Sequence, residues 1–140
     1  MMEVSEIRAW LMRGWKIDRE INALLRTYEE TRAMVLSITA NLQGDVVQST
    51  KNPHKFDKLV ELDDTINERI DELVSIKMEI LEVVQTVEDT RYRTLLIERY
   101  TQFKTWEQIA VDMHYSFRRI MELHNDALAA LRSTSPHRIS

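Results

Sequence analysis

An apolar residue recurs every three or four positions across nearly forty residues at the start of the chain. The series begins near Ser5 and contains Ile7, Trp10, Gly14, Ile17, Ile21, Leu24, Tyr28, Thr31, Val35, Ile38 and Leu42, with Gly14 and Thr31 as its weak points. This spacing places the apolar side chains along one face of an α-helix. A helix alone in water is only marginally stable, and in proteins most of its stability comes from packing of its apolar face, so the segment requires a partner.

A second series of the same kind supplies that partner. Residues 44–51 interrupt the pattern, and Asn52-Pro53 resembles a helix start, with an N-cap residue followed by proline in the first turn. The apolar positions that follow are Phe56, Leu59, Ile66, Ile70, Leu73, Ile80, Val84 and Val87. We therefore predict helices over about 5–42 and 53–88, joined by a loop at 43–52. A short connection favours an antiparallel helical hairpin, and we assign residues 1–89 to it.

The composition agrees with an all-α fold. The 140 residues include only two glycines and two prolines, too few for a sheet with many tight turns. There is no cysteine, which excludes disulfides and thiolate metal sites. No apolar run reaches membrane-spanning length and no secretory signal pattern is present, so we expect a cytoplasmic protein without a membrane partner.

The hairpin carries more apolar residues than two helices can cover. The additional positions are Leu11, Trp15, Leu25, Leu62, Val74, Ile76, Leu81 and Val83. Some of them must pack under the rest of the chain or against a second subunit, and we expect a homodimer.

The last third of the chain has the pattern of a helix-turn-helix. Asp89 can cap a helix from Thr90 to about Thr101, and Thr105 with Gln108 forms a capping-box sequence before a short helix over 106–113. His114 then occupies the turn position that favours a left-handed conformation, and Ser116 can cap a third helix that ends near Leu131. We assign residues 90–132 to a DNA-binding domain and residues 133–140 to a disordered tail.

Charge supports the same assignment. The net charge is −4, but residues 1–90 carry −7 and residues 91–140 carry +3. Only the C-terminal part is therefore suited to phosphate, and its small excess indicates that one copy would bind double-stranded DNA weakly. The residues expected to contact base edges lie on the third helix: Phe117, Arg118, Met121, Glu122 and Asn125. The residues expected to contact phosphates are Arg99, Lys104, Thr105, Ser116 and Arg119.

Three segments carry a resemblance to a known domain. Residues 92–100 (YRTLLIERY), residues 105–110 (TWEQIA) and the segment from Ser116 to Leu131 resemble region 4 of bacterial sigma factors, which recognises the upstream promoter element. Phe117 and Met121 stand where primary sigma factors usually have basic residues, so the resemblance does not imply the standard promoter preference. The whole chain, including LDDTINERIDELV at residues 62–74, is similar to small phage and prophage proteins of the RinA and ArpU types.

These resemblances imply a transcriptional regulator of phage or prophage genes that binds a promoter region and affects host RNA polymerase there. Two other functions stay open: a small-terminase-like protein of phage DNA packaging, and a protein-interaction module with a degenerate helix-turn-helix. The four histidines show no metal-ligand spacing, and the chain has no glycine-rich phosphate loop or nucleophile motif. We therefore expect no enzymatic activity, no cofactor, no metal and no small-molecule substrate.

Overall fold

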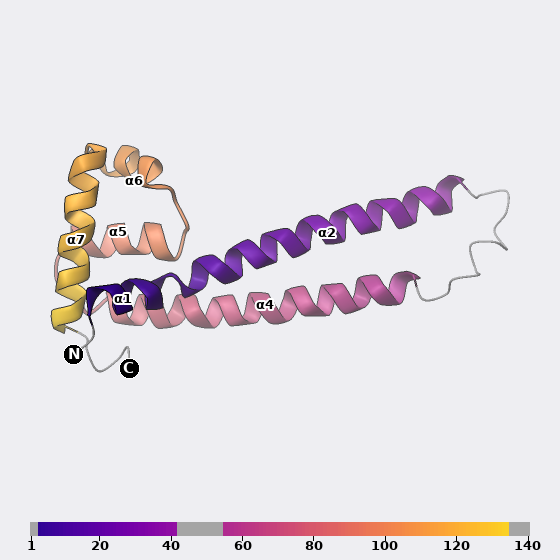
Figure 1. Cartoon of the computed structure of the whole chain (residues 1–140), viewed down its shortest axis with the longest axis horizontal. Helices are drawn as coiled ribbons and strands as arrows, with labels where there is room; N and C mark the ends of the chain where they lie inside the picture. The colour runs from indigo at the N-terminus through magenta and orange to yellow at the C-terminus, as the bar shows by residue number, and fades with distance from the viewer. Residues whose placement is uncertain (1–2, 42–54, 135–140) are drawn as a thin grey trace. The chain divides into compact units, whose positions relative to one another are not determined.

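The computed structural model describes residues 3–41 and 55–134, and most of these residues are helical. The helices are α1 (Val4–Leu11), α2 (Arg13–Asn41), α4 (Lys55–Val84), α5 (Thr90–Tyr100), α6 (Trp106–Met113) and α7 (Phe117–Thr134), as Figure 1 shows. The described residues form no strand. The prediction of an all-α fold is confirmed. The predicted loop at 43–52, the Asn52-Pro53 cap and most of the predicted tail lie outside the described residues.

The chain divides into two compact units. Unit 1 consists of Met1–Lys16 together with Leu73–Ser140, and unit 2 consists of Ile17–Glu72. These boundaries differ from the predicted division at residue 89, because unit 1 takes in both the first helix and the end of α4.

The long helix predicted over about 5–42 is interrupted at Met12. The backbone N–H of Met12 donates to the carbonyl oxygen of Arg8 and ends α1, and the N–H of Trp15 donates to the Met12 carbonyl oxygen as α2 begins. The apolar spacing of three and four continues through this break, and neither glycine nor proline stands at position 12. Periodicity alone therefore gave no sign of it.

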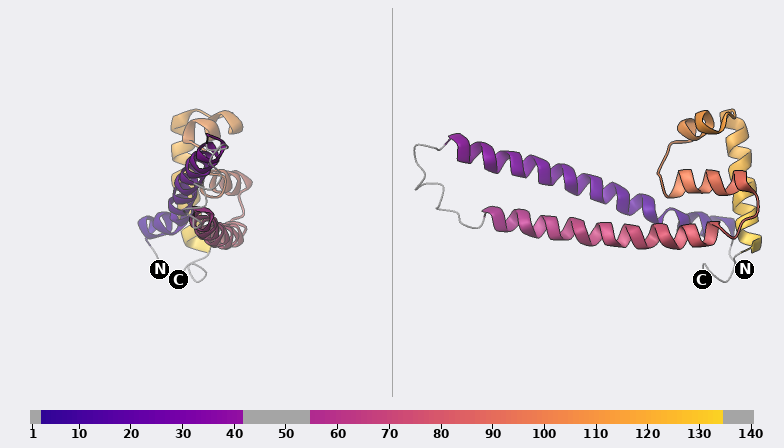
Figure 2. Two further views of the ribbon diagram at one scale, coloured as in Figure 1. Left: turned by 90° about the vertical axis from the view of Figure 1, so that its right-hand side faces the viewer. Right: turned by 180° about the vertical axis from the view of Figure 1, so that it is seen from behind.

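Unit 2 contains most of α2 and the first part of α4. Within it the two helices lie side by side and run in opposite directions (Figures 1 and 2). Their buried apolar residues are Ile21, Val35, Leu59 and Ile66, all of which belong to the two predicted apolar series. At the surface, Nε of Arg69 lies 3.1 Å from the carboxylate of Glu20, which links the two helices.

Unit 1 has a core of fully buried side chains. The second view of Figure 2 shows α5, α6 and α7 grouped together with α1. Helix α7 packs against α1, α5 and α6, and α5 also packs against α6. The core includes Ile7, Leu11, Ile80, Val84, Leu95, Leu96, Ile109, Ile120, Leu123, Leu128 and Leu131.

The additional apolar residues of the hairpin differ in burial. Leu11, Ile76 and Val83 are buried, Trp15, Leu62 and Leu81 are half-buried, and Leu25 and Val74 are exposed. Within the part of the chain that the structure describes, no helix has the combination of length and hydropathy that crossing a membrane requires.

Candidate nucleic-acid interface

Local capping interactions determine where α6 begins and ends and where α7 begins. The Thr105 hydroxyl accepts from the N–H of Gln108, and the Gln108 side chain accepts in return from the N–H of Thr105, so the predicted capping box is present. His114 ends α6 in the left-handed conformation, with φ 61° and ψ 39°. The Ser116 hydroxyl then accepts from the N–H of Arg119 and caps α7. The capping and turn roles predicted for Thr105, Gln108, His114 and Ser116 are thus present in the structure.

One face of α7 is held firmly against the rest of unit 1. Its inward residues Ile120, Leu123, Ala127, Leu128 and Leu131 are each 0% exposed. Ile109 and Ala110 of α6 are buried beside them, and the small side chain of Ala110 permits close approach of the two helices. This packing fixes the rotation of α7 and therefore decides which of its residues face outward.

The five predicted base-contacting residues all lie away from this core or at its edge. Phe117 is 49% exposed, the Arg118 side chain is 92% exposed, and Glu122 and Asn125 are exposed, whereas Met121 is half-buried. Nε of Arg118 lies 3.7 Å from the Glu122 carboxylate, a loose contact between two solvated groups. Such surface pairs contribute little stability, so both side chains can be redirected toward a ligand at small cost.

Two of the predicted phosphate-contacting residues are engaged with carboxylates. Nζ of Lys104 donates to Glu98 at 2.7 Å and to Asp112 at 2.8 Å, and these hydrogen bonds raise the pKa of Lys104. Arg119 lies 3.3 Å from the Glu122 carboxylate. The carboxylates offset the positive charge of Lys104 in particular, which makes it a weaker attractor for phosphate than its sequence position indicated.

Arg99 occupies a position inside a stack of aromatic rings. Its guanidinium carbon lies 4.4 Å from the ring centre of Trp15 and 4.2 Å from that of Trp106. The guanidinium also donates to the carbonyl oxygen of Lys104 at 2.9 Å. Cation–π contacts of this kind hold the charge in a fixed place. Arg99 therefore joins α2, α5 and α6 within unit 1, a structural role that the sequence did not reveal.

Phe103 is a second residue that sequence reasoning missed. It adopts a φ of 58°, which is uncommon for a bulky side chain. Its ring packs edge-on against Trp15, with the ring centres 5.4 Å apart, and lies 3.3 Å from the position that a Cβ atom on Gly14 would occupy. The absent side chain of Gly14 thus leaves room for this ring. No local sequence signal marks a phenylalanine for a left-handed conformation.

A buried polar pair joins α5 to α7. The Tyr100 hydroxyl and Nε2 of His124 are 2.7 Å apart, and both residues are almost fully buried. Burial raises the pKa of Tyr100 to about 12. Burial, followed by the positive charges of Arg8 and Arg99, lowers the pKa of His124 to about 4. The imidazole is therefore neutral at pH 7. His124 stands four residues after Ile120 and four residues before Leu128. This helical spacing is the sequence signal that could have placed its side chain in the core.

An open groove of about 320 Å³ adjoins this pair. Its lining comes from four helices of unit 1 and from the residue that follows α1: Arg8, Met12, Arg99, Tyr100, Trp106, Met121, His124 and Asn125. Two of the predicted base-contacting residues, Met121 and Asn125, thus share a surface with Arg8, a residue that the sequence analysis did not select. Among the described residues, no cluster of His, Asp or Glu side chains has the arrangement of a metal site.

Comparison with known protein families, with curated proteins and with solved structures found no match to this chain.

Proposed function

We propose that the protein is a sequence-specific DNA-binding regulator of transcription that uses α6 and α7 as a helix-turn-helix, with α7 entering the major groove. One observation carries the proposal: α7 is completely buried on one face and presents Arg118, Glu122 and Asn125 on the other, with Phe117 exposed at its first residue. Arginine, asparagine and glutamate are side chains that distinguish bases by their hydrogen-bonding edges. The resemblance to sigma region 4 and to phage regulators extends the proposal to phage or prophage promoters and host RNA polymerase.

Replacing Arg118 and Glu122 together by alanine should change the preferred DNA sequence. Each good bidentate base contact contributes about 1–3 kcal/mol of discrimination. The measurement is selection from random DNA by purified wild-type and double-variant protein, followed by fluorescence anisotropy on the selected sequences. Arg26→Ala with Glu30→Ala is a matched control, since this exposed arginine and glutamate have the same spacing on α2. The proposal fails if wild-type protein at low salt selects no sequence, or if the double variant selects the same one.

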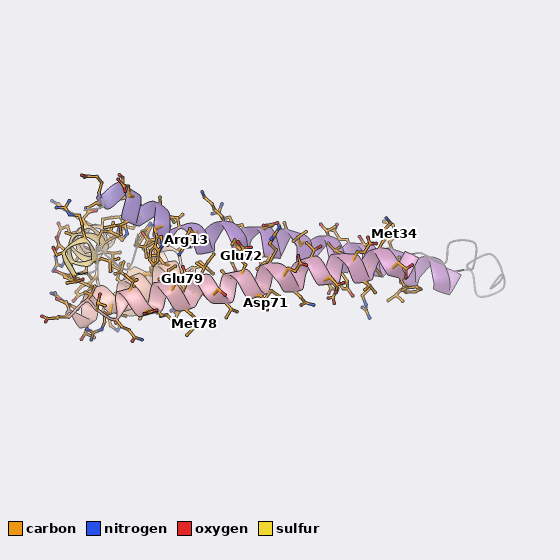
Figure 3. All side chains as sticks on the ribbon, turned by 90° about the horizontal axis from the view of Figure 1, so that it is seen from below. Arg13, Met34, Asp71, Glu72, Met78 and Glu79 are labelled. Atoms are coloured by element: carbon orange, nitrogen blue, oxygen red, sulfur yellow. The ribbon has the colours of Figure 1, made fainter. Side chains whose placement is uncertain are left out.

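We also propose that the functional form is a homodimer that pairs through α4. Val74 and Met78 are 53% and 61% exposed, and with Leu81 they form an apolar stripe at helical spacing. Figure 3 shows Met78 projecting from α4, while Glu79 is directed toward Arg13, with which it forms a 2.7 Å ion pair. In a parallel pair of α4 helices this stripe would lie against its copy, as in a coiled coil.

Met78→Lys should convert the dimer to a monomer, because it places a charge in the centre of this stripe. Light scattering after size-exclusion chromatography gives the mass directly. Met34→Lys is the control: Met34 is similarly exposed, at 62%, but lies on α2 in unit 2. A monomeric wild-type protein, or equal dissociation by both variants, would contradict dimerisation through the α4 stripe.

A further inference from the structure

Helix α1 brings a positively charged side chain to the edge of the proposed DNA-reading face. Ile7 and Leu11 are 1% and 0% exposed, so they anchor α1, which packs against α7. Arg8 follows Ile7 directly but is exposed, and it lines the same groove as Met121 and Asn125 of α7. We propose that this groove receives the sugar-phosphate backbone of bound DNA, with Arg8 contacting a phosphate group. The inference rests on the proposed function and adds a residue and a helix to it.

The charges around the groove favour an anion. Two of its lining residues are arginines, and none is an aspartate or glutamate. Arg8 forms no ion pair with any of the residues that the structure describes. Arg99 is held between the rings of Trp15 and Trp106, so its charge stays at the groove without rearrangement. The two like charges act together on the buried side chains beneath them, and both lower the pKa of His124. A phosphate group placed here would offset that positive field.

The place of the groove favours DNA backbone over a small anion. Met121 and Asn125 belong both to the groove and to the face of α7 that carries Arg118 and Glu122. When a recognition helix occupies the major groove, the phosphates of the bordering strands lie along its edges. The apolar surfaces of Met12 and Trp106 also suit the deoxyribose, which a free phosphate ion would leave uncovered. The groove is therefore placed and lined as a backbone-contact surface.

The test compares Arg8→Ala with wild-type full-length protein by fluorescence anisotropy on two DNA fragments, one selected by the wild type and one unrelated. Salt is varied over about 50–200 mM. Losing one phosphate contact should weaken binding to both fragments by a similar factor and reduce the slope of log affinity against log salt by about one. Arg8→Lys should retain most of the slope because it keeps the charge. Arg26→Ala, which removes an exposed arginine from α2 in unit 2, should leave affinity and slope unchanged.

The outcomes separate this inference from the proposed function. If wild-type protein binds neither fragment, the proposed function fails. If wild-type protein binds and Arg8→Ala keeps both its affinity and its salt slope, the role of Arg8 is overturned while DNA binding stands. Equal weakening by Arg8→Lys and Arg8→Ala, with thermal unfolding unchanged, would likewise overturn the phosphate contact. If Arg8→Ala lost affinity only for the selected fragment, Arg8 would be assigned to base recognition, and this would also contradict the inference.

Discussion

Leu11→Ala should destabilise the protein by about 2–5 kcal/mol, the usual cost of removing a fully buried leucine side chain from a core. Leu11 is 0% exposed and lies in α1, which packs against α7. Truncation therefore leaves a cavity in the core that supports the proposed recognition helix. Urea unfolding followed by circular dichroism and tryptophan fluorescence gives the change in the free energy of unfolding. We expect DNA affinity to fall in parallel at temperatures where the variant begins to unfold.

Leu25→Ala provides the comparison for this substitution. Leu25 is also a helical leucine, but it is 40% exposed. Its truncation should therefore lower the free energy of unfolding by well under half of the loss expected for Leu11→Ala. Equal effects of the two substitutions would show that α1 is not part of the core of unit 1. The proposed role of Arg8 would then lose its structural basis.

Acidification should destabilise the protein through His124. The pKa of His124 is lowered from 6.5 to about 4, chiefly by burial and then by Arg8 and Arg99. Between these two pH values the unfolded chain binds a proton that the folded chain does not. The stabilisation is therefore complete above pH 6.5 and is lost as the pH falls toward 4. A shift of this size corresponds to about 3 kcal/mol in the free energy of unfolding.

His124→Gln isolates that contribution from the carboxylates, which also titrate at low pH. The variant should lose most of the pH dependence between 6.5 and 4, whereas wild type should retain it. Direct titration of the imidazole by NMR gives the pKa itself, and Arg8→Ala should raise it because one source of positive charge is removed. An imidazole that titrates near 6.5 in folded wild-type protein would contradict the burial of the Tyr100–His124 pair.

Local signals predicted the C-terminal helices well. Asp89 accepts from the N–H of Arg91 at 2.8 Å and caps α5, and the roles of Thr105, His114 and Ser116 were all legible from residue type and spacing. These interactions span only two to four residues, so a single sequence contains all the information they need. The inward apolar residues of α7 followed equally from helical periodicity.

Contacts between distant segments were not predictable in the same way. The sequence shows Lys104 as a basic residue beside a helix start, but not that Glu98 and Asp112 both reach its Nζ. Similarly, the sequence shows Arg99 as a basic residue on a helix, but its stacking between Trp15 and Trp106 follows only from the packing. The break at Met12 belongs to the same class, since it allows α1 to pack on α7 without disturbing the apolar period.

Unit 1 is assembled from two stretches of chain separated by the whole of unit 2. Ile7 and Leu11 therefore emerge from the ribosome more than a hundred residues before the α7 side chains that complete their core. Until then the apolar face of α1 lacks α7, the helix against which it packs, and loop closure over this separation carries an entropic cost. The hairpin segment of unit 2, whose contacts are closer in sequence, can form first. The surface proposed to bind DNA would thus be completed last, after synthesis of α7.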